Sequence, residues 1–209
     1  MKYIYIILAA GLLAGILAGL FLAFGLPFSQ IKNIQTLRIV SMGERPTGDA
    51  ESLKRVISEE FPKVKLSVDK SVDMPSIALN KDRSQYNADT LLQELNKGSN
   101  QYEYVIAVTS EPLFSPGLNF VFSAVRDNIG VITTDYLATN VKSEEQFEER
   151  LRKVAKRMVG TMVGLHPRLT GDFKCAMRFS NSLDELDAKG LEWCGNEKER
   201  LLKAQILSQ

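Results

Sequence analysis

Side chains that commonly carry catalysis are few in this chain, and their spacing does not group them into a site. His166 is the only histidine, and one imidazole alone does not make a metal site. Cys175 and Cys194 have no convincing base nearby in the sequence, and no Gly-x-Ser-x-Gly turn is present. Four carboxylates of the same region also lack a histidine at ligand spacing: Asp172, Asp184, Glu185 and Asp187. The sequence therefore favours a function other than hydrolysis.

A mixed α/β (α+β) pattern of strands and helices must position these residues. Apolar runs, alternating or continuous, predict strands at residues 36–42, 64–68, 104–109, 119–122 and 129–133. Apolar residues at helical spacing predict helices at residues 49–61, 87–98, 143–165 and 183–202. Ser143 followed by Gln146 is a capping box that starts the third of these helices. This order predicts a mixed, twisted sheet with packed helices, in a body that spans residues 36–209.

The first part of the chain differs sharply from this body. Residues 4–26 contain no charged side chain and would span about 35 Å as a helix, at roughly 1.5 Å per residue. A cleaved signal peptide usually has a shorter apolar core and ends at a small-residue site, which Ala23-Phe24-Gly25 could imitate. The length favours an uncleaved single-pass membrane anchor at residues 1–29, followed by a linker at residues 30–35. Positive charges lie on both sides of the span, and the short leading segment favours a body outside the cytoplasm.

Three glycines recur at every fourth residue of this apolar segment, namely Gly11, Gly15 and Gly19. The spacing places them on one face of a helix, where another transmembrane helix can approach closely. This glycine face predicts a partner helix, either from a second copy of the chain or from another membrane protein. The alternative is that glycine is simply common in membrane helices and signal sequences.

The charge balance bears on a further class of partner. The chain has 26 Lys and Arg residues against 25 Asp and Glu residues, for a net charge of +1. Nucleic-acid binding requires a local excess of basic residues to contact phosphates, and no such excess is found. The sequence therefore predicts no nucleic-acid partner.

Three segments of the body carry a more specific pattern. They read Arg-Ser-Gln-Tyr-Asn at residues 83–87, Leu-Phe-Ser-Pro-Gly-Leu-Asn-Phe-Val-Phe at residues 113–122, and Cys-Ala-Met-Arg-Phe-Ser-Asn-Ser-Leu at residues 175–183. The third segment is followed by Asp187, Lys189 and Cys194. Occurring together and in this order, they resemble archaemetzincins, a family of zinc-dependent peptidases. The resemblance covers roughly residues 36–200 and implies a zincin-like fold. The N-terminal anchor is not part of the family pattern.

The resemblance also implies where catalysis would occur. Archaemetzincins carry His-Glu-x-x-His-x-x-Gly-x-x-His, whose histidines hold zinc and whose glutamate is the general base. The matching segment is residues 157–167, in which Gly164 is retained and the ligand and base positions hold Arg157, Met158, Thr161 and Pro167. Arginine stays protonated and threonine is a poor ligand, so the motif is degenerate and implies no catalytic residue, metal or cofactor. Met177 matches the methionine turn that underlies the metal, and we expect it to be a core residue here.

The family also has a structural zinc held by four cysteines. The matching positions hold Arg168, Cys175, Cys194 and Glu197, and two thiols do not close a tetrahedral site. Former partners in such a site would lie close together, so Cys175 and Cys194 form either a disulfide or two free, partly buried thiols. A disulfide would require an oxidising compartment, in agreement with a body outside the cytoplasm.

The resemblance and the replaced ligands together predict a membrane-anchored, catalytically inactive peptidase-like protein that acts as a structural or interaction module. Its former cleft would accept a peptide through main-chain hydrogen bonds at an edge strand. It could equally be an accessory subunit of a membrane complex. Arg157 would take over the charge of the absent metal and pair with a carboxylate such as Asp172. The alternative is a metal-dependent peptidase that uses non-standard ligands.

Overall fold

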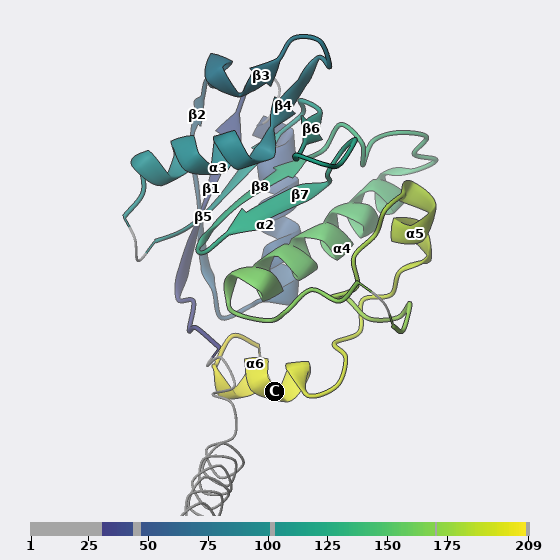
Figure 1. Cartoon of the computed structure of the whole chain (residues 1–209). Helices are drawn as coiled ribbons and strands as arrows, with labels where there is room; N and C mark the ends of the chain where they lie inside the picture. The colour runs from purple at the N-terminus through teal and green to yellow at the C-terminus, as the bar shows by residue number, and fades with distance from the viewer. Residues whose placement is uncertain (1–30, 44–46, 101–102, 170, 208–209) are drawn as a thin grey trace, which may run out of the picture. The chain divides into compact units, whose positions relative to one another are not determined.

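A five-stranded mixed sheet lies at the centre of the computed structural model (Figure 1), which describes residues 31–43, 47–100, 103–169 and 171–207. The strands are β1 (Thr36–Met42), β2 (Lys65–Val72), β5 (Tyr104–Thr109), β7 (Ser123–Arg126) and β8 (Ile129–Thr133), in the order β2-β1-β5-β8-β7. Neighbouring strands are parallel except for β7, which runs antiparallel to β8 at one edge. The central strand β5 is buried at every position, as its continuous apolar run predicts.

Helices cover both faces of this sheet. Helices α2 (Thr47–Glu60) and α4 (Glu144–Met162) pack against each other on one face, and α3 (Ala88–Lys97) packs on the other (Figure 1). Two helix starts follow from the sequence, because the side chains of Asn87 and Ser143 accept hydrogen bonds from the N–H groups of Thr90 and Gln146. Helix α4 contacts β7 and β8 and carries residues 157–162 along the sheet.

A second sheet of three short strands was not predicted. It consists of β3 (Leu79–Asn80), β4 (Gln85–Asn87) and β6 (Leu113–Phe114), preceded by the 3-10 helix η1 (Ser76–Ala78). Strands of two or three residues are too short to show a period in the sequence. Arg83 and Gln85 donate to the carbonyl oxygen of Asn119 at 2.6 and 3.1 Å, which anchors the loop before β7. Residues 119–122 therefore form a loop, and the strand predicted there lies at β7.

The predicted single helix at residues 183–202 is wrong. Two short helices, α5 (Leu183–Ala188) and α6 (Glu197–Lys203), are separated by non-helical chain. Lys189 ends α5 with extended dihedral angles (φ −69°, ψ 139°), and the N–H of Gly190 donates to the carbonyl oxygen of Phe173. A Cβ added at Gly190 would lie 2.5 Å from the carbonyl oxygen of Lys174. Close packing against the preceding loop therefore overrides the helical periodicity.

The N-terminal boundary of the folded unit also differs from the prediction. The unit begins at residue 31, so most of the predicted linker at residues 30–35 belongs to it. Ile34 is 2 % exposed, and the N–H of Lys32 donates to the carbonyl oxygen of Val163. The predicted anchor at residues 1–29, with its glycine face, lies outside the described residues. Within the ranges that the structure describes, no helix has both the length and the apolar character needed to cross a membrane.

Candidate functional site

A cavity of about 230 Å³ lies between the loop of residues 117–123, helix α4 and the segment of residues 179–189. Several apolar side chains form part of its wall, including Phe120, Phe122, Val154 and Leu186. The polar side chains in the wall are Asn119, Ser123, Arg157, Ser180, Asn181 and Lys189. Among the described residues that line the cavity, the charged ones are two cations, and none is a carboxylate.

Arg157 contributes one of these cations from α4. Its Nη2 donates to Ser123 Oγ at 3.0 Å, and its Cζ lies 5.5 Å from the centroid of the Phe179 ring. Burial lowers the pKa of Arg157 to about 10, so the guanidinium remains protonated at neutral pH. The predicted pair with Asp172 is wrong: the contacts of Arg157 among the described residues do not include this carboxylate, which accepts a hydrogen bond from the N–H of Lys174 at 2.9 Å. No other carboxylate of the described chain forms an ion pair with Arg157.

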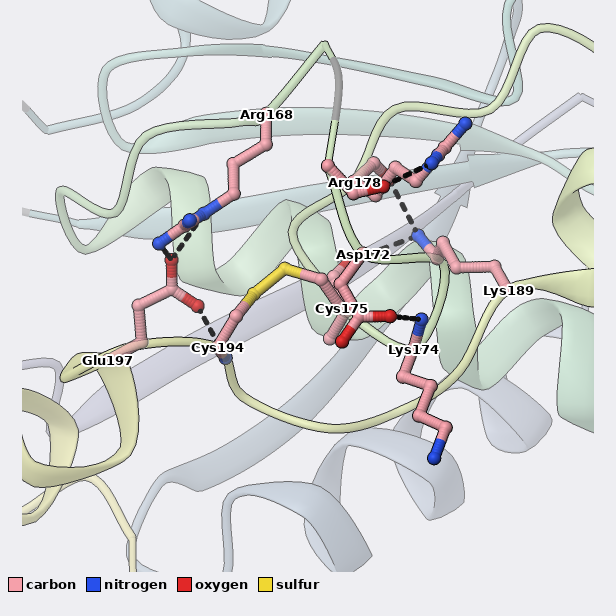
Figure 2. The surroundings of a disulfide bond; sticks show 10 residues. Arg168, Asp172, Lys174, Cys175, Arg178, Lys189, Cys194 and Glu197 are labelled. Atoms are coloured by element: carbon pink, nitrogen blue, oxygen red, sulfur yellow. Dashed lines mark hydrogen bonds and ion pairs between the residues drawn. A yellow bond between two sulfur atoms is a disulfide. The ribbon is translucent and has the colours of Figure 1, made fainter.

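Lys189 is a second basic residue at the cavity, and although it belongs to the segment that carries the resemblance, no role was predicted for it. The residue is 3 % exposed, and its Nζ donates to the carbonyl oxygens of Ala176 and Arg178 at 3.0 and 3.1 Å (Figure 2). Burial is the main reason that the pKa of Lys189 falls to about 7, and repulsion from Arg157 and Lys153 adds to it. In the sequence this lysine reads as one polar residue of a predicted helix, so no pattern marks it as buried.

The other positions of the 157–167 segment do not form a ligand set. Met158 is fully buried in the core, and Thr161 Oγ1 donates to the carbonyl oxygen of Arg157 at 2.9 Å. Pro167 and the neighbouring His166 are exposed beyond the end of α4. None of the four motif positions offers an imidazole, a carboxylate or a thiolate, so this donor set does not fit a zinc ion.

Met177 is buried against α4. A Cβ added at Gly160 would lie 2.7 Å from Met177 Sδ, so glycine at this helix position permits the close approach. The N–H of Arg168 donates to the carbonyl oxygen of Met177 at 2.9 Å, and the N–H of Phe179 donates to the carbonyl oxygen of Arg168 at 2.8 Å. These contacts join the turn around Met177 to the chain that follows α4.

A disulfide and an ion pair lie next to each other in the irregular region after α4 (Figure 2). The disulfide joins Cys175 and Cys194, whose Cα atoms are 5.3 Å apart. Arg168 donates from Nε and Nη2 to Glu197 Oε1 at 3.2 and 3.1 Å, and Glu197 Oε2 accepts from the N–H of Cys194 at 3.0 Å. Glu197 is only 4 % exposed. The disulfide therefore joins two of these four residues and the ion pair joins the other two.

Three of these residues could be considered as metal ligands. Cys175, Cys194 and Glu197 offer ligand atoms that lie within 4.8 Å of one another. However, the two sulfur atoms are bonded to each other, and both carboxylate oxygens accept hydrogen bonds. A metal at this place would require reduction of the disulfide, so the oxidised chain does not fit a structural zinc.

Comparison with known proteins relates this geometry to a family. The profile of Peptidase family M54 matches residues 52–203. The archaemetzincin of Methanopyrus kandleri is 35% identical over 140 residues, which cover 66% of this chain and 77% of that protein. The archaemetzincin of Halobacterium salinarum is 29% identical over 164 residues, which cover 72% and 93% of the two chains.

Solved structures agree with the sequence comparison. The crystal structure of Methanopyrus kandleri archaemetzincin matches with a TM-score of 0.71 at 31% identity, and covers 82% of this chain and 96% of that one. The archaemetzincin of Archaeoglobus fulgidus, solved in complex with malonate, gives a TM-score of 0.68 at 23% identity, with 79% and 99% covered. At this lower identity the likeness bears on the fold alone. Both matches confirm the predicted mixed α/β fold.

Proposed function

Because the chain belongs to peptidase family M54, the archaemetzincins, we propose that it is a member of this family that binds a polypeptide without cleaving it. The observation that carries the proposal is Arg157, which stands at the first metal-ligand position of the family motif. Its guanidinium donates a hydrogen bond to Ser123, lies near the Phe179 ring and stays protonated at neutral pH. A fixed cation at this position repels a metal ion and cannot coordinate it.

The other replaced positions support the same proposal. Hydrolysis by a zinc peptidase requires a metal that activates water and a carboxylate that accepts its proton. Met158, at the position of the general base, is fully buried and has no proton-accepting group. The hydroxyl of Thr161 donates a hydrogen bond to the carbonyl oxygen of Arg157 in the same helix. These side chains therefore supply neither the ligands nor the base that the reaction needs.

Binding of a polypeptide is supported by the edge strand β7. This strand is the last in the sheet order and pairs with β8 on one side only, within the described residues. Its first residue, Ser123, holds Arg157 at the cavity wall. An open strand edge can add an extended peptide through main-chain hydrogen bonds, while a neighbouring pocket receives a side chain. The cavity of about 230 Å³ is such a pocket.

A metal-dependent peptidase that uses other ligands is the competing proposal, and family membership favours it. The carboxylates of the surrounding region have other partners, however. Glu185 accepts a hydrogen bond from the N–H of Asn181 at 2.8 Å, and Asp187 pairs with Arg150 at 2.7 Å. In the described ranges, the potential ligands that gather in one place are those of the disulfide region. We therefore favour binding without hydrolysis.

We further propose that residues 4–26 anchor the chain in a membrane and that the folded unit lies outside the cytoplasm. The uncharged length of this segment supports an anchor, and the disulfide supports an oxidising compartment. A membrane protein or a second copy would pack on the glycine face of Gly11, Gly15 and Gly19, which would make the chain an accessory subunit. Replacing these glycines by leucine should abolish co-purification of that partner, and its retention would contradict this role.

Metal content and peptidase activity of the full-length chain test the loss of hydrolysis. After dialysis against a weak chelator, elemental mass spectrometry should find zinc far below one ion per chain, and peptides should stay intact with zinc added. A variant with serine at both Cys175 and Cys194 excludes a zinc ion held by reduced thiols. Stoichiometric zinc in that variant, together with peptide cleavage, would refute the proposal.

A further inference from the structure

We infer that the cavity beside Arg157 and Lys189 binds a carboxylate carried on a small apolar body, such as the C-terminal residue of a polypeptide. Only the assignment of the carboxylate to a polypeptide rests on the proposed function. The inference adds the chemical group that the cavity recognises. The charge, the unused hydrogen-bond donors and the apolar walls of the cavity support the site itself.

The charge of the cavity lining favours an anion. Arg157 and Lys189 line the same cavity, and no described carboxylate lines it with them. Lys153, which also repels Lys189, is paired with Glu149 at 2.7 Å and so has its own counterion. Below about pH 7, where Lys189 is protonated, two cations share the cavity without a counterion and repel each other, and an anion placed between them relieves this repulsion. The cavity is therefore electrostatically complementary to a negative group.

The cavity lining also has unused hydrogen-bonding capacity. Ser180 lines the cavity at 8 % exposure, and its buried Oγ has no hydrogen-bond partner in the described part of the chain. A buried hydroxyl without a partner destabilises a protein unless a ligand or water satisfies it. Arg157 has five N–H donors, of which one binds Ser123, and Lys189 has three, of which two bind carbonyl oxygens. A carboxylate has the lone pairs to accept from all three side chains.

The apolar part of the cavity lining indicates which kind of molecule carries the carboxylate. Phe120 and Phe122 line the cavity with their rings in an edge-to-face contact, at a centroid distance of 5.2 Å. Val154 and Leu186 add aliphatic surface. A fully hydrated inorganic ion gains nothing from such walls, whereas an apolar group attached to the anion is removed from water. The lining therefore favours an organic carboxylate over inorganic phosphate or sulfate.

Calorimetric titration of the full-length chain with phenylacetate tests the inference, with phenylacetamide as the uncharged control of the same shape. We expect the acid to bind at least about tenfold more tightly than the amide, because its hydrogen bonds are charge-assisted. Arg157→Met and Lys189→Met should each weaken binding of the acid about tenfold and leave binding of the amide unchanged. Lys142→Met removes an exposed charge that does not line the cavity, and should have no effect.

A second pair of ligands identifies the source of the carboxylate. If N-acetyl-Gly-Phe binds more tightly than phenylacetate and its C-terminal amide does not, the carboxylate belongs to the end of a polypeptide. Equal affinity of the two acids assigns it to a free organic acid, and both results support the site. The inference would be overturned if acids and amides bind equally well or if none of the ligands binds. It would also be overturned if the preference for the acid over the amide persists in both the Arg157→Met and the Lys189→Met variant. Zinc content and peptide cleavage are measured in separate experiments, so a failure of the proposed function can be distinguished from a failure of the carboxylate site.

Discussion

Replacing Lys189 by methionine should remove most of the increase in stability that we expect between about pH 7.5 and about pH 9.5. Burial, and then repulsion from Arg157 and Lys153, lowers the pKa of Lys189 to about 7 from an ordinary value of 10.5. Between these values the unfolded chain binds a proton at this site that the folded chain has released. The free energy of unfolding therefore rises with pH, by at most about 1.4 kcal/mol per pH unit and by roughly 2 kcal/mol over the interval.

Urea unfolding of the full-length chain, followed by the fluorescence of the single tryptophan, measures this slope at several pH values. The variant also loses two hydrogen bonds to carbonyl oxygens, so the slopes are compared and not the absolute stabilities. The charged neighbours Arg157, Lys153 and Asp187 are present in both proteins, and Lys142→Met controls for the loss of one exposed charge. A wild-type stability that is constant over the interval, or an equal slope in the Lys189→Met variant, would show that Lys189 is not held in this environment.

Three further predictions concern the region after α4, and each is measured by urea unfolding. Gly190→Ala should lower the free energy of unfolding by about 3 kcal/mol, because the new Cβ would lie 2.5 Å from the carbonyl oxygen of Lys174. Gly48→Ala is the control: it lies in helix α2, has nothing within 4 Å of the new Cβ, and should leave this free energy unchanged or raise it slightly. Asp187→Asn should cost about 2 kcal/mol, because it leaves the Arg150 guanidinium, 4 % exposed, without its carboxylate. Hydrogen bonds from Arg150 lower the pKa of Asp187, so this contribution should be present at neutral pH and be lost as the pH falls through that pKa; equal acid sensitivity of the variant would contradict it. Reduction of the disulfide, which closes a sequence separation of 19, should cost about 3 kcal/mol, and a loss below about 1 kcal/mol would contradict its structural role.

Local sequence patterns predicted the elements that have a long period or a clear cap. Strand β5 was predicted at its observed bounds from one apolar run, and α3 and α4 were predicted from their caps at Asn87 and Ser143. Strands β3, β4 and β6 have two or three residues each, which is too short for a period to appear. The false helix at residues 183–202 has helical spacing, but packing of Gly190 on the Lys174 backbone excludes a helix there. Tertiary contacts of this kind are not encoded in a local window.

The candidate site was predictable only where a residue occupies a position of the family motif. The replacement of the ligands at Arg157 and Thr161 could be stated from the resemblance alone. The partners of Arg157 could not be predicted, because Ser123 and Phe179 come from distant parts of the chain. Lys189 belongs to the segment that carries the resemblance, but its burial could not be predicted, since its partners are two carbonyl oxygens of an irregular loop. The part of the site geometry that depends on loops could therefore be described only from the structure.

The resemblance matches two groups of residues to metal-ligand positions, and their replacement would have different chemical consequences. Around Cys175, the structural role of a metal is to cross-link the loop to the core, and the disulfide with the pair of Arg168 and Glu197 also does this. Around Arg157, the catalytic role of a metal is to supply positive charge and to acidify a bound water. A guanidinium supplies the charge, but it stays protonated and does not make a water molecule a nucleophile. Under the proposed function, the site would therefore keep its attraction for an anion and lose the hydrolytic step, and this combination is the chemistry expected of a binding protein built on a peptidase fold.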